Sequence, residues 1–377
     1  MSLATKTPVR KLSVLAFLAA LGCSLLVACG AQREASSGAH SPTGIWRALP
    51  PAPIRVDAAS TTVWTGRELI VAGVRGGSDG TLLDHAQVAA AYDAATNSWR
   101  RLPSPPPSEA YCRRAAVWTG EQMLVWGCRQ TAFDPAANRW RLLPQAPGGQ
   151  GMVVWTGKEM LGWGGGCCGD AWAGGEAYDP GTNRWRTLAP SPLAPEQGPL
   201  GVWTGRELLL FVSGINPADG RPWPARLARA AAYDPESDTW RRIAPMPVHG
   251  LRFGGTAVWD GREVLVVGAG RRGRSTFAYD PAENHWRRLA PLPAARLDAA
   301  AAWTGRRLLV WGTGDRRSIT SGAFAYDPSL DRWSPLPAAQ VRGAGQVFWT
   351  GRRLLLWSDA GRFGGAVFTP ARGGQVR

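Results

Sequence analysis

The sequence contains few charged residues, few lysines and few histidines. Charged side chains make up 19% of the 377 residues, there are four histidines, and after residue 28 the only lysine is Lys158. In contrast, 45% of the residues are hydrophobic and 20 are tryptophan, so the composition is not that of a disordered chain. Glycine (47 residues) and proline (30 residues) are abundant, which indicates many turns and argues against a helical bundle.

The positive charge comes almost entirely from arginine. The formal net charge is +15, and arginine enriched together with alanine, glycine and proline is what codon bias in a GC-rich genome produces. A basic surface attracts anionic partners, but no basic helix and no nucleic-acid-binding motif accompanies this charge. We therefore expect no nucleic-acid partner.

The first 43 residues have the pattern of a targeting segment followed by a tether. Residues 1–28 combine a basic start with an apolar run that is short for a membrane span. Leu26-Val27-Ala28-Cys29 resembles the lipobox of bacterial lipoproteins, which implies cleavage before Cys29 and lipidation of its sulfur. Residues 29–43 are small and polar, as expected of a flexible tether. We expect an extracytoplasmic protein held on the membrane through the lipid anchor only; the alternative is an ordinary signal peptide and a chance cysteine.

Two short strings recur along the rest of the chain. The first, VWTG or a close variant, has its tryptophan at Trp64, Trp118, Trp155, Trp203, Trp259, Trp303 and Trp349. The second, of which AYDPGTNRW is one copy, ends at Trp99, Trp140, Trp185, Trp240, Trp286 and Trp333. Their regular alternation indicates a repeat architecture of seven units.

Each string predicts a hairpin. The glycine of Thr-Gly permits a tight connection between antiparallel strands. In Tyr-Asp-Pro-x-x-Asn, proline presets φ and asparagine tolerates the left-handed region. The runs between the turns, such as QMLVWG, are short, apolar and β-prone. Each repeat is therefore expected to form four antiparallel strands, which we call a to d.

The two ends of the repeat region complement each other. The seventh repeat stops at Arg377 without a strand d, whereas Thr43–Pro53, which contains Trp46, looks like a strand d by itself. An open ring would expose two unpaired sheet edges, so we expect the N-terminal strand to complete the last repeat. The predicted fold is all-β: a seven-bladed β-propeller of four-stranded antiparallel blades over residues 44–377, the last blade closed by the N-terminal strand.

Over residues 44–370 the sequence resembles the kelch family of β-propellers, also called galactose-oxidase-like. The resemblance rests on the glycine after strand b, the tyrosine of strand c and the tryptophan of strand d, repeated in register. Members of that family range from enzymes to scaffolds, so the function must be sought in the loops.

The loops between strands b and c vary most in length. In a propeller they share one face with the d–a loops, and variable loops on a rigid scaffold usually carry specificity. Trp172 and Trp223 lie in the third and fourth b–c loops, and Tyr111 starts the second strand a. We expect these aromatics to stack on sugar rings or to pack on a partner protein. The alternative is that they fold back over their own loops.

The start of strand a, seven residues before the tryptophan of the first string, is charged in the later repeats. It is Glu196 in the fourth repeat and Arg252, Arg296 and Arg342 in the last three. Guanidinium groups bind carboxylates well, so we expect an anion-attracting sector near the central channel. The alternative is that these arginines are solvated or paired with nearby aspartates.

The cysteines point to an oxidising compartment. Beyond the lipidated Cys29, four cysteines remain, which allow three disulfide connectivities. Cys112 and Cys128 flank the second Thr-Gly turn almost symmetrically, so a cross-strand disulfide in blade 2 is expected. The adjacent Cys167 and Cys168 could form a vicinal ring, bond elsewhere or stay reduced. Because no Cys-x-x-Cys occurs, we expect no metal site.

Two sequence matches to catalytic or cofactor-binding motifs lack the neighbouring helix that each motif requires. The G-x-G-x-x-G match at Gly268–Gly273 is followed by a strand instead of a helix, and the G-x-S-x-G match at Gly76–Gly80 lacks the helix of a nucleophile elbow. The resemblance implies that copper enzymes of this fold use histidine and tyrosine ligands, yet only His85 and His249 lie on the b–c side. We therefore expect neither a cofactor nor a copper oxidase.

Two functions remain. We prefer a non-enzymatic module, a monomeric and membrane-anchored propeller that binds a glycan or a protein through its b–c/d–a face. The alternative is a sugar-directed enzyme similar to the sialic-acid mutarotases that share kelch repeats. In that case Glu196 would serve as acid or base, and Arg252 or Arg296 would clamp the carboxylate of the sugar.

Overall fold

In the computed structural model the chain forms two compact units, residues 1–39 and residues 40–377. The described residues all belong to the second unit: 44–56, 60–76, 82–107, 114–127, 129–148, 151–166, 169–248, 255–269, 273–294, 297–313, 321–339, 341, 345–358 and 364–371. At 76, 82–85, 297, 298, 313 and 321 only the backbone is described. These residues form seven four-stranded antiparallel sheets.

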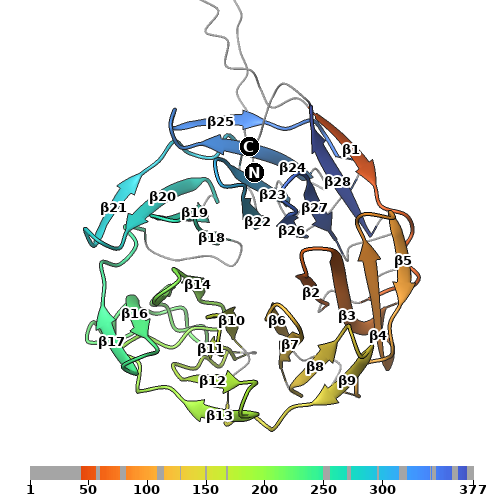
Figure 1. Cartoon of the computed structure of the whole chain (residues 1–377). Helices are drawn as coiled ribbons and strands as arrows, with labels where there is room; N and C mark the ends of the chain where they lie inside the picture. Colours follow the sequence, from red (N-terminus) through yellow and green to blue (C-terminus); the bar gives the residue numbers. More distant parts are fainter. Residues whose placement is uncertain are drawn as a thin grey trace, which may run out of the picture. The chain divides into compact units, whose positions relative to one another are not determined.

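Each sheet is one blade of a propeller, with strands a to d in chain order in blades 1 to 6 (Figure 1). Blade 1 comprises β2 (Thr61–Trp64), β3 (Glu68–Gly76), β4 (Leu82–Asp93) and β5 (Ser98–Arg101). Blade 2 comprises β6 (Ala115–Trp118), β7 (Met123–Trp126), β8 (Thr131–Asp134) and β9 (Arg139–Leu142). Blade 3 comprises β10 (Met152–Trp155), β11 (Met160–Trp163), β12 (Gly175–Asp179) and β13 (Arg184–Thr187). Blade 4 comprises β14 (Leu200–Trp203), β15 (Leu208–Phe211), β16 (Ala230–Asp234) and β17 (Thr239–Arg242).

Blades 5 and 6 follow the same plan, and blade 7 takes its strand d from the N-terminal strand β1. Blade 5 comprises β18 (Thr256–Trp259), β19 (Val264–Ala269), β20 (Ser275–Asp280) and β21 (His285–Arg288). Blade 6 comprises β22 (Leu297–Trp303), β23 (Leu308–Thr313), β24 (Ser321–Asp327) and β25 (Arg332–Pro335). Blade 7 comprises β26 (Gln346–Trp349), β27 (Leu354–Trp357), β28 (Gly365–Pro370) and β1 (Gly44–Ala48). The prediction of seven four-stranded blades is confirmed.

The last blade is closed by the N-terminal strand, as the sequence predicts. β1 pairs antiparallel with β28 and places Trp46 opposite Phe368. The side chains of Thr62 in blade 1 and Gln346 in blade 7 form a hydrogen bond between the two innermost strands. The ring therefore closes through backbone pairing within blade 7 and side-chain contact with blade 1, which removes the two free sheet edges of an open ring.

The repeated turns adopt the conformations that their residues favour. In the first a–b turn, Gly66 has φ of 93°, and the hydroxyl oxygen of Thr65 accepts a hydrogen bond from the amide of Glu68 at 2.8 Å. Six c–d turns place Asn97, Asn138, Asn183, Asp238, Asn284 and Asp331 at positive φ. Side chains that tolerate the left-handed region thus set the hairpins locally.

The tryptophan of each outer strand ties its blade to the preceding one. Its indole nitrogen donates a hydrogen bond to a backbone carbonyl just after strand d of that blade. The pairs are Trp99–Pro50, Trp140–Pro103, Trp185–Pro144, Trp240–Ala189, Trp286–Ala244, Trp333–Ala290 and Trp46–Pro337, at 2.8 to 2.9 Å. Because Trp46 belongs to the N-terminal strand, the circle of hydrogen bonds has no gap.

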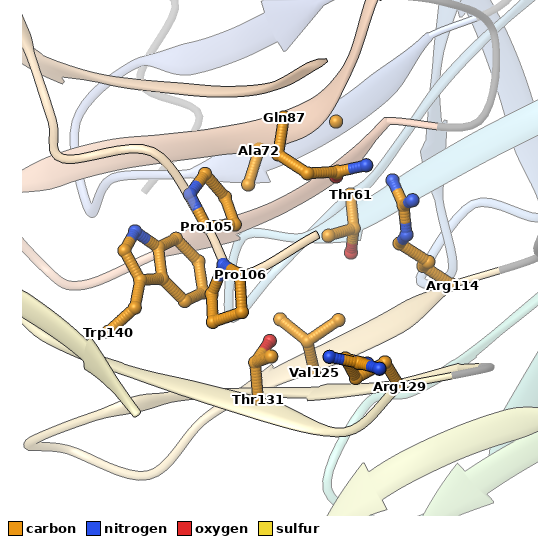
Figure 2. Close-up of a pocket in the computed structure, with 11 residues that line it drawn as sticks. Thr61, Ala72, Gln87, Pro105, Pro106, Arg114, Val125, Arg129, Thr131 and Trp140 are labelled. Carbon is orange, nitrogen blue, oxygen red and sulfur yellow. The ribbon is translucent and has the colours of Figure 1, made fainter. Parts of the chain in front are cut away.

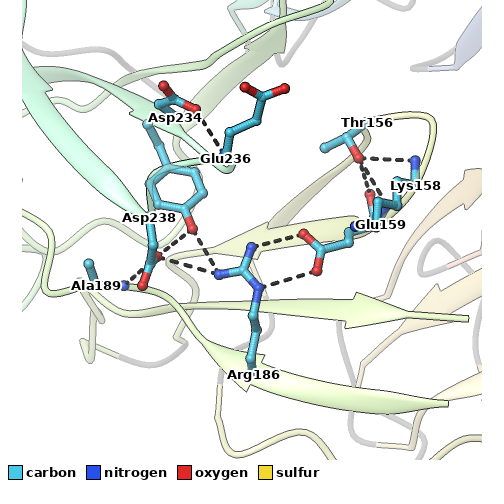
Figure 3. A network of polar contacts seen from close by, with 9 residues as sticks. Thr156, Lys158, Glu159, Arg186, Ala189, Asp234, Glu236 and Asp238 are labelled. Carbon is cyan, nitrogen blue, oxygen red and sulfur yellow. Dashed lines mark hydrogen bonds and ion pairs between the residues drawn. The ribbon is translucent and has the colours of Figure 1, made fainter. Parts of the chain in front are cut away.

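A charged network adds a second connection between blades (Figure 3). Arg186 in strand d of blade 3 donates two hydrogen bonds to Glu159 of the same blade, at 2.8 and 3.2 Å, and one to the hydroxyl of Tyr233 in blade 4 at 3.0 Å. Tyr233 in turn donates to Asp238 at 2.6 Å. Burial raises the pKa of Tyr233 well above its ordinary value, so this hydroxyl stays protonated and continues to donate.

Candidate functional site

A pocket opens between blades 1 and 2 on the predicted b–c/d–a face. Its empty volume, which includes space open to solvent, is about 320 Å³. It is lined by Thr61, Ala72, Gly73, Gln87, Pro105, Pro106, Arg114, Val125, Arg129, Thr131 and Trp140. The starts of strands a and c and the ends of strand b meet at this face, so the pocket lies among the variable loops.

The pocket exists because one inter-blade position holds a small residue. The last core residue of strand b is, from blade 1 to blade 7, Ala72, Trp126, Trp163, Phe211, Val267, Trp311 and Trp357. Between blades 2 and 3, the ring of Trp126 is 1% exposed and covers Gly162, where a Cβ would overlap it. Ala72 has no ring to place over blade 2, so the equivalent volume stays open.

The pocket has an apolar end and a cationic end (Figure 2). Pro105, Pro106 and Trp140 lie together on one side, whereas the guanidinium groups of Arg114 and Arg129 lie on the other. Gln87 is 7% exposed and points its amide into the space between the two ends. Two guanidinium groups beside an amide suit a carboxylate or another oxyanion, and the opposite wall suits the apolar face of a sugar ring.

The two arginines differ in their surroundings. Arg129 in the b–c loop of blade 2 is exposed and forms no hydrogen bond or ion pair with a described residue. Arg114 just before β6 is half-buried. Arg129 is thus the guanidinium more readily available to a ligand, while Arg114 lies deeper beside Thr61 (Figure 2).

Glu196, the candidate acid or base, holds two loops of the same face together. One carboxylate oxygen accepts hydrogen bonds from the amide of Ser213 at 2.8 Å and from its hydroxyl at 2.5 Å. The other accepts from the amide of Gln197 at 3.1 Å. These bonds join the d–a loop after blade 3 to the b–c loop of blade 4, and a catalytic role for Glu196 stays a prediction.

The structure separates the two predicted tryptophans. Trp172 is 43% exposed, and its backbone forms an isolated bridge with that of Glu196. Trp223 is half-buried and packs on the apolar cluster between blades 3 and 4. Trp172 therefore presents an aromatic surface beside Glu196, whereas Trp223 packs against the apolar cluster, and a ligand-binding role for either residue stays a prediction.

The other predicted site residues lie outside the described residues. These are Tyr111, Arg252, Arg296, Arg342, the lipidation site Cys29 and the proposed disulfide partners Cys112 and Cys128. The arginine sector of blades 5 to 7, the disulfide and the anchor thus stay predictions. The sequence analysis missed Arg114 and Arg129, although the alanine at a position where four other repeats carry tryptophan was a visible signal.

Within the described part of the chain, no group of three His, Cys, Asp or Glu side chains could hold a metal ion. The side chain of His85 and the whole of His249 lie outside that part, so the expectation of no copper site stays a prediction. The same residues include no helix with the length and apolar character that a membrane crossing requires.

Comparisons with known proteins define the fold. No family model matches the sequence, and neither does any curated protein. The structure is similar to that of a fungal alcohol oxidase of the AA5 family in complex with copper, with a TM-score of 0.67 and 15% identity over 87% of this chain and 76% of that chain. It is also similar to the structure of YjhT, with a TM-score of 0.52 and 14% identity over 76% of this chain and 99% of that chain.

These likenesses show a shared β-propeller fold. The copper in the first structure belongs to that oxidase. At identities of 14 and 15%, the chemistry of either protein is not transferred to this chain.

Proposed function

We propose that this protein is an extracytoplasmic binding module that recognises an anionic ligand, of the acidic-glycan class, through the pocket between blades 1 and 2. The observation that carries the proposal is the pairing of Arg114 and Arg129 at one end with Pro105, Pro106 and Trp140 at the other. Charge-assisted hydrogen bonds to a carboxylate and stacking on an aromatic ring are how a protein holds an acidic sugar without a catalytic group.

The test fills the pocket with tryptophan, the residue that four other blades have at the position of Ala72. The variant Ala72→Trp gives blade 1 the side chain found at this position in blade 2, and it should abolish retention of carboxylated oligosaccharides on an array that also carries matched neutral ones. The double variant Arg114→Gln/Arg129→Gln should weaken retention by at least about tenfold, since each lost charged hydrogen bond is worth roughly 1.5–3 kcal/mol.

A matched control removes two arginines from the opposite face. Arg67 and Arg206 lie in the a–b turns of blades 1 and 4 and are exposed, so Arg67→Gln/Arg206→Gln lowers the net charge equally and should leave retention unchanged. Equal losses in both double variants would mean that net charge alone holds the glycan, and undiminished retention by Ala72→Trp would exclude the pocket.

The enzymatic alternative rests on Glu196, which lies on the same face beside the exposed Trp172. An anomerisation assay with acidic sugars separates the two functions. A binding module shows no acceleration, whereas a sugar-directed enzyme loses its acceleration on Glu196→Gln while the retention of ligand persists.

The proposal includes a membrane anchor at Cys29, a monomeric state and a glycan or protein as the partner. Metabolic labelling with a radioactive fatty acid, compared between the native chain and Cys29→Ser, tests the anchor. Incorporation that persists in the variant would contradict it.

A further inference from the structure

Blades 6 and 7 differ from blades 1 to 5 on the face formed by the a–b and c–d turns. In four of the first five blades, a glutamate that precedes the core of strand b pairs with an arginine of strand d, at 2.6 to 2.9 Å. Blade 2 has Gln122 in place of the glutamate. The same two positions hold Arg307 and Ser334 in blade 6 and Arg353 and Arg47 in blade 7. Like blade 2, both blades lack the carboxylate that pairs with arginine in blades 1, 3, 4 and 5, and unlike blade 2 they have an arginine in its place.

Exposed arginines are denser on this face of blades 6 and 7 than on that of blades 2 to 4, where Arg139, Arg184 and Arg206 are single exposed arginines without an ion pair to a described residue. Five arginines of blades 6 and 7 are exposed and form no ion pair with any other residue of the described ranges: Arg47, Arg306, Arg332, Arg352 and Arg353. Blade 7 also has Thr369 where each of the other six blades has the aspartate that begins the c–d turn. Asp327 of blade 6 is 3.4 Å from Arg307 and also interacts electrostatically with Arg306, so it offsets part of the positive charge of blade 6.

Two large apolar side chains are exposed beside these arginines. Leu330, at the tip of the c–d turn of blade 6, is 62% exposed, and Ile45 in β1 is 64% exposed. At the position of Leu330 the first five blades have Thr96, Ala137, Thr182, Ser237 and Glu283. We call the five arginines together with Ile45 and Leu330 the basic apolar patch.

The chain enters the propeller at this patch. Gly44, the first residue of β1, pairs with Pro370 at the end of strand c, which is the side of the c–d turns. Any segment that precedes Gly44, including Cys29, is therefore joined to the propeller on the face that carries the patch and not on the face that carries the pocket.

We propose that the basic apolar patch docks on an anionic phospholipid surface. Guanidinium groups pair with headgroup phosphates, and exposed isoleucine and leucine side chains enter the boundary between headgroups and acyl chains. Each basic residue near a negatively charged membrane adds to the attraction, so the patch would hold the propeller on the membrane surface beside the lipid anchor proposed at Cys29. Docking would turn the pocket between blades 1 and 2 away from the membrane.

The test measures the partition of the full chain carrying Cys29→Ser onto vesicles of phosphatidylglycerol and phosphatidylcholine in equal amounts. The variant Arg352→Glu/Arg353→Glu should bind these vesicles at least about tenfold more weakly, and added salt should affect its binding less. Leu330→Ser should weaken binding about threefold and leave the salt dependence unchanged. The N-terminal apolar run is common to all variants, so ratios between variants report on the patch.

The matched control is Arg221→Glu/Arg226→Glu, which changes the net charge equally at two exposed arginines in the b–c loop of blade 4, on the opposite face. It should bind as the parent chain does. Equal weakening of both double variants, or a partition unaffected by Arg352→Glu/Arg353→Glu, would overturn the proposal. Undisturbed retention of acidic oligosaccharides by the same variants verifies the fold, and it separates failure of this proposal from failure of the one for the pocket.

Discussion

The interfaces between blades 1 and 2 and between blades 2 and 3 are built from the same repeat positions but are filled differently. In the first, Ala72, Val125 and Thr131 border an open pocket. In the second, their equivalents are Trp126, Gly162 and Glu176, and the ring of Trp126 lies against Gly162. A large residue opposite a glycine closes one interface, whereas an alanine opposite a valine leaves the other open.

The closed interface also contains an unusual acid. Glu176 is 6% exposed, one of its carboxylate oxygens has no hydrogen-bond partner, and burial raises its pKa above the ordinary value. A threonine takes its place at the open interface. Exchanging residues between these equivalent positions shows which differences decide whether an interface is a packed core or a binding pocket.

Replacing Trp126 by Ala, the residue of blade 1, is expected to have the largest effect. It removes a fully buried ring, so the free energy of unfolding should fall by about 3–5 kcal/mol. Urea unfolding followed by circular dichroism measures this loss. A loss below about 1 kcal/mol would mean that the ring does not support the interface.

Replacing Gly162 by Val should have the second largest effect. Valine is the residue at the equivalent position of blade 2, Val125. A Cβ at this position overlaps the ring of Trp126, so the variant should lose about 1–3 kcal/mol of stability. The double variant Trp126→Ala/Gly162→Val should be more stable than the sum of the single losses predicts, because the valine fills part of the space. Strict additivity in the double-mutant cycle would contradict a direct contact.

Glu176 makes stability depend on pH. Because its pKa is raised in the folded state from the ordinary 4.5, both states hold the proton at pH well below 4.5. As pH rises above 4.5, the unfolded chain releases the proton first, and the stability conferred by the neutral carboxyl is lost as pH rises through the folded pKa. Glu176→Gln should remove this dependence and be more stable by about 1 kcal/mol at neutral pH. Parallel pH profiles for the two proteins would show that another group is responsible.

Replacing Glu159 by Gln should have the smallest effect. Glutamine is the residue at the equivalent position of blade 2, Gln122. The pair with Arg186 is partly exposed to solvent, so we expect a loss of about 0.2–1 kcal/mol that shrinks with added salt. Thermal unfolding at low and high salt measures it. A larger loss at high salt would indicate a packing role instead of an electrostatic one.

Much of the architecture was readable from the repeated strings. The glycine of each Thr-Gly and the Asn or Asp of each c–d turn adopt positive φ, as their residue types predict. The isolated strand-d pattern around Trp46 correctly predicted the closure of blade 7. The pocket was not predicted, because Ala72 and Arg129 belong to different repeats and nothing in either repeat alone indicates that they line one space.

The sequence by itself determined the number of blades, their turns and the strand that closes the ring, because each of these depends on neighbouring residues whose conformational preferences repeat in register. The tertiary structure decided where side chains from adjacent blades meet, which opens the volume beside Ala72 and brings Arg114 to Arg129. It also brought Ile45 to the end of the propeller where β1 begins, opposite Thr369 of the last repeat. Contacts between distant segments depend on how whole blades pack, and local preferences do not encode that packing.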